Sequence, residues 1–139
     1  ALIVVVSDLL PPPETTETDL SALIGAHLAR LRALLGGLRA RRHDVVVLQV
    51  LDPEELDLPF EGTYQFEDLE PTVGERGRLL CDPADVRALY RQEMQRFLDE
   101  VRRGFQENDI EHRLALTAEP PEQTLLSLLQ GPLRGRLRR

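Results

Sequence analysis

Residues 45–50 read VVVLQV, and apart from Gln49 they are apolar, which predicts a strand. Residues 2–6 read LIVVV, and the run ends at Ser7 and Asp8. This uninterrupted run of β-branched and apolar residues is typical of a strand buried on both faces, as in a parallel sheet. Residues 110–116 indicate a third strand. The sequence therefore predicts a mostly parallel sheet.

Two long helices are predicted between these strands. Apolar residues recur at three- and four-residue steps from Leu20 to Leu38, which places them on one helical face. A strand, a helix and a strand in this order form a right-handed βαβ unit in nearly all known cases. The second helix begins with Asp82 as N-cap and Pro83 in the first turn, and its apolar period continues to Phe105.

Shorter elements complete the predicted fold. Residues 63–69 and 78–82 are extended candidates with glycines between them, which favours an antiparallel hairpin inserted after the second strand. A proline pair ending at Pro121 opens a last short helix that is rich in leucine. We expect one α/β domain over residues 1–130, a doubly wound (Rossmann-like) sheet with helices on both faces, and a basic tail over residues 131–139.

Composition limits the classes of function. The chain has 139 residues, a formal net charge of −7 and no apolar run long enough to span a membrane, so we expect a cytoplasmic domain without membrane contact. The negative charge argues against nucleic-acid binding. The chain begins without Met, directly on an apolar strand, so we expect preceding residues in a parent protein. The sequence leaves open whether that parent is membrane-anchored.

Residues 45–56 read VVVLQVLDPEEL, and residues 58–60 and 66–70 continue with LPF and FEDLE. This string resembles a bacterial family of unknown function whose C-terminal part is a von Willebrand factor A-like domain. Members are commonly encoded beside MoxR-type AAA ATPases. The leucine pair ending at Leu80, the Asp82-Pro83 pair and Tyr90 continue the likeness over most of the chain. The resemblance implies a protein-interaction domain with a MoxR-type ATPase as partner.

Two departures from the family pattern matter. The family tends to place Gly before the His-Asp pair that precedes the second strand, but this chain has Arg42 there. The metal-ion-dependent adhesion site of such domains begins with an Asp-x-Ser-x-Ser motif, which is absent from this sequence. On the family's ordering, the chain is the C-terminal half of the domain, and Asp8 matches the late aspartate of the metal site. The resemblance thus implies one ligand of an incomplete Mg²⁺ site, completed only in the whole domain.

Acidic residues follow two of the predicted strands. Asp8 stands at a position where open α/β sheets place ligands, and its other role is to cap the proline-rich loop. Further acids follow the second strand, and they could form a catalytic cluster, a metal cup, a solvated loop or a surface for an Arg-rich partner. These acids are Asp52, Glu54, Glu55 and Asp57.

The histidines and the cysteine have no second metal-binding residue at the sequence spacing of a metal-ligand motif. His27, His43 and His112 are far apart, and Cys81 is the only cysteine, so we expect all four to be structural. No phosphate-binding loop or nucleophile elbow is present, so we expect no enzyme. Aromatic residues of the second long helix fit core packing, and Gly36 with the next glycine indicates either a hinge or a close helix contact.

The leading hypothesis is a protein-interaction module with no cofactor of its own. The alternative from a different class is a Rossmann-like metal-dependent hydrolase that uses Asp8 and Asp52. Because residues 2–6 would form an apolar sheet edge, we also expect self-association through this strand.

Overall fold

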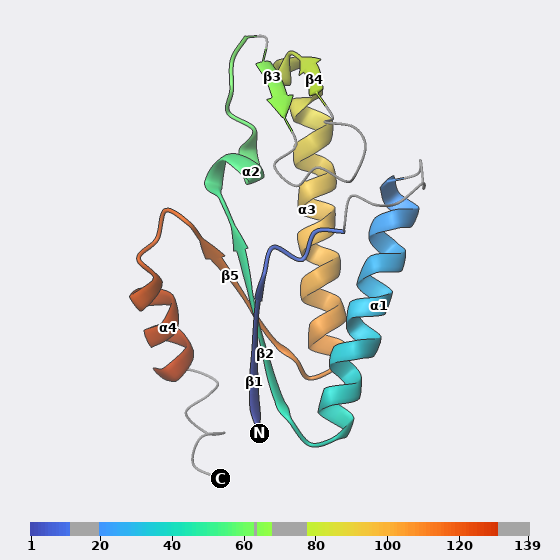
Figure 1. Ribbon diagram of the computed structural model, residues 1–139, viewed down its shortest axis with the longest axis vertical. Helices are drawn as coiled ribbons and strands as arrows, with labels where there is room; N and C mark the ends of the chain where they lie inside the picture. The colour runs from blue at the N-terminus through green and yellow to red at the C-terminus, as the bar shows by residue number, and fades with distance from the viewer. Residues whose placement is uncertain (12–19, 63, 68–77, 131–139) are drawn as a thin grey trace.

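The computed structural model describes residues 1–11, 20–62, 64–67 and 78–130 (Figure 1). Its main sheet has three parallel strands in the order β1-β2-β5, and a two-stranded antiparallel hairpin pairs β3 with β4. The strands are β1 (Leu2–Ser7), β2 (Asp44–Leu51), β3 (Tyr64–Glu67), β4 (Arg78–Cys81) and β5 (Glu111–Leu116). The helices are α1 (Leu20–Ala40), α2 (Pro53–Asp57), α3 (Pro83–Glu107) and α4 (Pro121–Gln130).

The three predicted strands form the parallel sheet that the sequence predicts. The expected burial of residues 2–6 on both faces is wrong, because Leu2, Val4 and Val6 are 39–64% exposed on one face of β1. β2 is the central strand, and its residues Val45, Val46 and Val47 are fully buried because helices cover both faces. β1 pairs with β2 from Leu2 opposite Asp44 onward, and in the described sheet it has no strand on its other side. The predicted antiparallel hairpin is also present, with bounds within a few residues of the expected ones.

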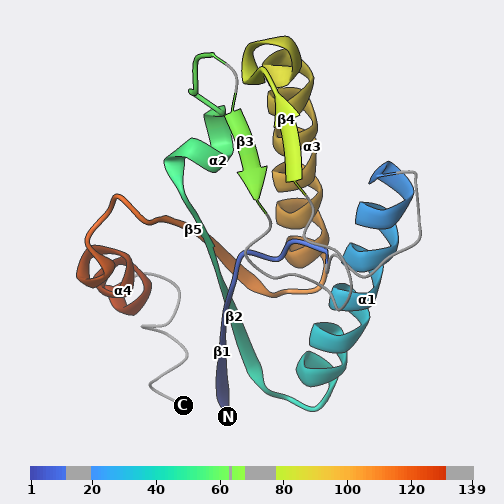
Figure 2. The ribbon, with the colours of Figure 1, turned by 45° about the horizontal axis from the view of Figure 1, so that its top comes forward.

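Helices α1 and α3 cover one face of the sheet and α4 covers part of the other (Figure 2). Both crossovers, β1-α1-β2 and β2-α3-β5, move across the sheet in the same direction. Right-handed connections therefore place both long helices on the same face. The main core lies on this face, where Phe97, Val101 and Phe105 of α3 meet Val45 and Val47. The expected α/β architecture with helices on both faces is confirmed.

The packing of α1 against α3 depends on small residues. A Cβ at Gly104 would stand 2.6 Å from the side chain of Arg32, and one at Gly36 would stand 3.3 Å from Asn108. Asn108 also donates to the Gly104 carbonyl at 2.8 Å, which closes the end of α3. Because α1 continues unbroken through Gly36, this glycine serves a close helix contact and not a hinge.

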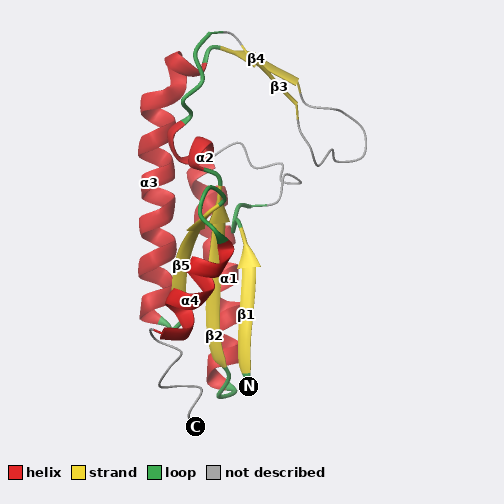
Figure 3. Ribbon diagram, turned by 90° about the vertical axis from the view of Figure 1, so that its left-hand side faces the viewer, coloured by secondary structure: helices red, strands yellow, loops and turns green. Residues whose placement is uncertain are grey.

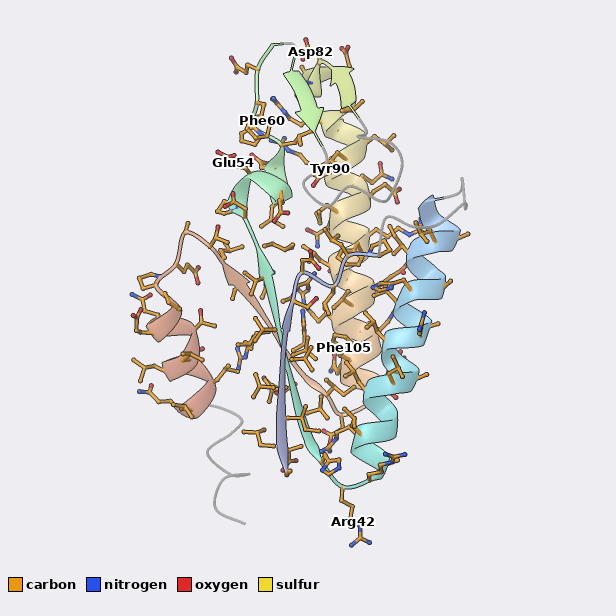
Figure 4. The ribbon with its side chains drawn as sticks, viewed as in Figure 1. Arg42, Glu54, Phe60, Asp82, Tyr90 and Phe105 are labelled. Atoms are coloured by element: carbon orange, nitrogen blue, oxygen red, sulfur yellow. The ribbon has the colours of Figure 1, made fainter. Side chains whose placement is uncertain are left out.

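The connection from α1 to β2 contains a strained residue. Arg42 has a φ of 63°, in the left-handed region that a residue with a Cβ rarely adopts. This is the position at which the resembling family tends to have Gly. Arg39 anchors the connection, because it forms an ion pair with Asp44 at 3.0 Å and another with Asp109. Figure 4 shows Arg42 extending away from the fold at this turn.

Arg42→Gly is therefore expected to raise the free energy of unfolding, by about 0.5–1 kcal/mol, because glycine adopts positive φ without steric cost. Chemical denaturation of the two proteins measures the change. Arg41→Gly is the matched control, since Arg41 is also exposed and does not have a positive φ. We expect this control to lower stability. An equal effect of both substitutions would show that the backbone strain at Arg42 is not the cause.

Candidate functional site

The carboxyl ends of β1, β2 and β5 lie at one edge of the sheet, and the residues just beyond them surround an open pocket of about 480 Å³. Asp8 follows β1, Asp52 follows β2 and Thr117 follows β5. The remaining lining comes from the end of β2, from the α2 segment and from α3, namely Val50, Glu54, Glu55, Leu58, Phe60 and Tyr90. The structure thus brings together four of the five acids singled out in the sequence. Asp57 faces Arg91 instead, at 2.7 Å.

The acids after β2 belong to a short helix, where a solvated loop was the simplest expectation. Asp52 is the N-cap of α2, and its carboxylate accepts from the Glu54 amide at 2.9 Å. Glu55 accepts in return from the Asp52 amide at 2.6 Å, which completes a capping box. Pro53 occupies the first helical position, as Pro83 does in α3. Capping therefore fixes two of the pocket's carboxylates.

Asp52 also connects two strands. The Thr117 hydroxyl donates to its second carboxylate oxygen, and the Thr117 amide donates to the Leu51 carbonyl at 3.0 Å. The bond from Thr117 and the bond from the Glu54 amide together lower the pKa of Asp52. Thr117 was not among the predicted site residues. Its signal in the sequence is the one that marks Asp8 and Asp52, a polar side chain directly after a buried strand.

Asp8 adopts the turn role that the sequence allowed. Its carboxylate accepts from the Leu10 amide at 3.1 Å, a typical Asx turn. Between them, Leu9 is buried and has a φ of 63°. The Asp8 carbonyl accepts from the side-chain amide of Gln49 at 3.0 Å. The turn after β1 is thus held in a strained conformation by hydrogen bonds on both sides.

Gln49 extends this network to β5. The residue is fully buried on the face covered by α1 and α3, and its side-chain oxygen lies 3.0 Å from Nε2 of His112. Because the Gln49 amide donates to Asp8, the oxygen must accept, so Nε2 of His112 carries the proton. His112 also contacts the ring of Phe105, with ring centroids 5.7 Å apart. A polar chain therefore runs through the core from His112 to the turn at Asp8.

The donor set does not fit a divalent metal ion. Among the described residues, no group of three or more His, Cys, Asp or Glu side chains is placed to hold one. Mg²⁺ prefers an octahedral set of oxygen ligands. Here the Asp52 carboxylate accepts hydrogen bonds from the Glu54 amide and the Thr117 hydroxyl. The Asp8 carboxylate accepts one from the Leu10 amide. We therefore derive no chemistry through a metal at this edge.

Arginine and tyrosine side chains of α3 fix the outer wall of the pocket. Arg87 donates to the carbonyls of Leu58, at 2.8 Å, and of Phe60. The Tyr90 hydroxyl donates to the Glu55 carbonyl at 2.5 Å. Burial and the nearby Glu55 carboxylate raise the pKa of Tyr90, so the hydroxyl stays protonated. Figure 4 shows Phe60 and Tyr90 on either side of the space between α2 and α3.

A second, apolar pocket of about 330 Å³ adjoins the first and shares Glu55 and Tyr90 with it. It lies between the turn after β1 and helices α1 and α3. The apolar part of its lining is formed by Leu10, Pro11, Ile24, Met94 and Phe97, and its two acids are Glu55 and Glu93. The apolar face of α3 therefore serves both the core and the pocket. Phe105 is buried in the core, Phe97 is buried and also lines the pocket, and Tyr90 and Met94 border the pocket.

The other residues considered in the sequence lie away from these pockets. His27 is in the middle of α1, and His43 precedes β2 with its ring 3.4 Å from the N-terminal amine. Cys81 ends β4. Within the part of the chain that the structure describes, none of the helices combines the length and the hydropathy that a bilayer crossing requires.

Acidification is expected to weaken the fold through His112. Burial, with the nearby Arg102 charge, lowers the pKa of His112 from 6.5 to about 4. Below pH 6.5 the unfolded chain binds a proton that the folded chain does not, so stability falls from pH 6.5 toward pH 4. The expected loss is roughly 1–2 kcal/mol, after allowance for solvent screening of this partly exposed ring.

His112→Gln isolates this contribution, because its amide can still donate to Gln49 but does not titrate. Urea denaturation between pH 7 and pH 4 should show a shallower loss of stability for the variant than for the original chain. Parallel curves would mean that His112 does not carry the pH dependence.

Fold and site together define a small α/β domain with an acidic pocket and an apolar pocket at the carboxyl edge of a parallel sheet. The chain belongs to the family described as protein of unknown function DUF58, which matches residues 1–100, from β1 into α3. The expectation of a family of unknown function is thereby confirmed. Neither a curated protein nor a solved structure is significantly similar to the chain.

Proposed function

We propose that the chain is a protein-interaction module that binds an arginine-containing segment of a partner at the carboxyl edge of its sheet. We call the two adjoining pockets together the carboxyl-edge surface. One observation carries the proposal: an acidic pocket and an apolar pocket share Glu55 and Tyr90, and neither has a basic residue in its described lining. Such a surface suits an arginine next to a large apolar side chain.

Charge and shape both support this ligand. Asp8, Glu54 and Glu55 present carboxylates at the open pocket, and guanidinium groups pair with carboxylates in bidentate geometry. The neighbouring pocket is lined by aliphatic and aromatic side chains, which favour burial of a leucine-sized group. The chain's net charge of −7 would also attract a basic partner from a distance. Capping and the Arg87 contacts hold the surface in shape before binding, which lowers the entropic cost.

The likeness of residues 45–70 to a von Willebrand factor A-like family supports a more specific form of the proposal. In that form the partner is a MoxR-type AAA ATPase, and the domain completes a Mg²⁺ site only with the Asp-x-Ser-x-Ser motif that this chain lacks. Asp8 would then be a positioned turn residue in the chain itself and a ligand only in the whole domain. The protein-binding role does not depend on that metal.

A peptide titration tests the proposal. The probe is a blocked six-residue peptide of alternating arginine and leucine. Its affinity for the full chain is measured by calorimetry. Glu54→Gln should weaken binding by about 3–10-fold, since it removes a carboxylate of the acidic pocket and leaves the capping bond to the Glu54 amide in place. Glu107→Gln is the matched control at the end of α3, outside both pockets, and should bind like the original chain. No binding, or equal weakening by both variants, would contradict the assignment.

One observation supports the alternative of a metal-dependent hydrolase: Asp8 and Asp52 line the same pocket. It requires that the chain bind Mg²⁺ or Mn²⁺ through these carboxylates. Calorimetric titration with each metal separates the two functions. The interaction module should give no saturable heat. Binding that is abolished by Asp8→Ala or by Asp52→Asn would establish a metal site in this chain and replace the proposal with the hydrolase.

A further inference from the structure

The acidic pocket of the carboxyl-edge surface is built by the central strand and its neighbours, away from the unpaired edge of β1. Its walls come from the ends of β2 and β5, from α2 and from Tyr90 of α3, and Asp8 is the one residue of its described lining that follows β1. Figure 3 shows α2 next to α3, beyond the carboxyl end of β2. Hydrogen bonds from Arg87 and Tyr90 to the backbone of residues 55–60 connect these two helices.

The carboxylates of this pocket have no basic partner within the described part of the chain. No ion pair between described residues includes Asp8, Glu54 or Glu55. On the neighbouring helix α3, Arg87 donates to backbone carbonyls, and Arg91 pairs at 2.7 Å with an acid outside the pocket. The adjoining apolar pocket of about 330 Å³ also has no basic residue in its described lining. A ligand that fits both pockets therefore carries an arginine beside a large apolar side chain.

The chain itself contains a segment of this composition. Residues 131–139, the expected basic tail, read GPLRGRLRR and lie outside the described residues. We call them the arginine segment. They include four arginines and no acid, whereas all 24 acidic residues of the chain precede them. Two of the arginines directly follow a leucine, in the pairs Leu133-Arg134 and Leu137-Arg138. The arginine segment is therefore complementary to the carboxyl-edge surface in charge and in its pairing of arginine with leucine.

The length of the arginine segment allows it to reach this surface. Thr117 lines the acidic pocket, and α4 begins four residues later, at Pro121. α4 then leads away from the carboxyl edge (Figure 1) and ends at Gln130, about 15 Å from its first residue. Nine residues in extended conformation span up to about 30 Å. Residues 131–139 can therefore return along α4 to the pocket of the same chain.

We propose that the arginine segment binds the carboxyl-edge surface of its own chain and competes there with the partner. The competition rests on the proposed function, since both require a surface that accepts arginine next to leucine. An arginine of the segment pairs with the carboxylates of Asp8 and Glu54, and the adjacent leucine enters the apolar pocket. A tethered ligand has a roughly millimolar effective concentration at its site. The segment therefore lowers the apparent affinity for every partner and excludes weak ones.

Glutamine in place of the four arginines tests the proposal in the full chain. The variant carries Arg134→Gln, Arg136→Gln, Arg138→Gln and Arg139→Gln. The matched control carries the same change at four exposed arginines that line neither pocket, namely Arg30→Gln, Arg41→Gln, Arg42→Gln and Arg103→Gln. Because both chains lose four positive charges, general attraction to a basic peptide rises equally in both. Calorimetry with the blocked arginine-leucine peptide should show about 3–10-fold tighter binding to the variant than to the control, because the tethered competitor is removed.

The outcomes separate this proposal from the proposed function. If the peptide binds the variant and the control equally, the competition is overturned and the proposed function stands. If the peptide binds neither chain, the proposed function fails and the competition with it. Amide spectra of the ¹⁵N-labelled original chain and variant give a readout without peptide. They should differ at residues 8–11 and 52–60, far in sequence from the substitutions, and unchanged signals there would overturn the proposal. A dimer of the original chain that the variant does not form, seen by sedimentation equilibrium, would overturn binding within one chain.

Discussion

Phe105→Ala is expected to lower the free energy of unfolding by about 3–5 kcal/mol, the range typical of a buried phenylalanine reduced to alanine. Phe105 is 1% exposed and lies where α3 meets the sheet (Figure 4). Its removal leaves a cavity beside Val101 and the His112 ring, and the surrounding helix and strands cannot close it completely. Since domains of this size are stable by about 5–15 kcal/mol, the variant should be close to unfolding.

Urea denaturation followed by circular dichroism measures this change. Leu89→Ala is the control on the same helix, because Leu89 is exposed on the solvent face of α3. It should change stability by no more than about 0.5 kcal/mol. A loss below about 1 kcal/mol for Phe105→Ala would mean that the core does not centre on the contact between α3 and the sheet.

Gln49→Leu is expected to lower the free energy of unfolding by about 2–3 kcal/mol although leucine has a similar size and is more apolar. Gln49 is fully buried, and its amide satisfies the Asp8 carbonyl on one side and Nε2 of His112 on the other. The substitution leaves both groups without this partner in the core. It also releases the turn after β1, so the chain should bind the arginine-leucine peptide less tightly.

Gln95→Leu is the control for this substitution, since Gln95 is exposed on α3 and donates across the helix surface to Asp99 at 3.1 Å. Stability and peptide affinity should both stay near those of the original chain. If Gln49→Leu is as stable as the control, the polar chain from His112 to Asp8 is not a structural element of this fold.

The central strand could be predicted because burial on both faces leaves its mark in composition, as residues 45–50 show. Residues 2–6 have the same apolar composition, but one face of β1 is exposed. All three predicted strands, 2–6, 45–50 and 110–116, lie within one or two residues of an observed strand. The caps of α3 could be predicted because Asp82 and Pro83 act locally. The sequence has Arg42 where the resembling family tends to have Gly, and the positive φ of Arg42 shows that this departure strains the backbone.

The site could be predicted only in part. Asp8 and the acids after β2 were expected near the carboxyl edge, because parallel strands end at the same side of a sheet. The Asp52 to Glu55 capping box was overlooked because the acidic run suggested a loop, although Asp52-Pro53 repeats the pattern of Asp82-Pro83. Contacts such as Thr117 with Asp52, or Gln49 with His112, depend on strand register, which the sequence of one chain does not show.

Binding of a protein partner at the carboxyl-edge surface can be observed residue by residue. The most direct measurement is a map of backbone amide shifts in the ¹⁵N-labelled full chain when a MoxR-type ATPase from the same genome is added. We expect shifts that concentrate in residues 8–11, 52–60 and 90–97, with few in α4 or in the amino end of β1. Shifts confined to α4 and β1, or an unchanged spectrum with both the ATPase and the arginine-leucine peptide, would contradict it.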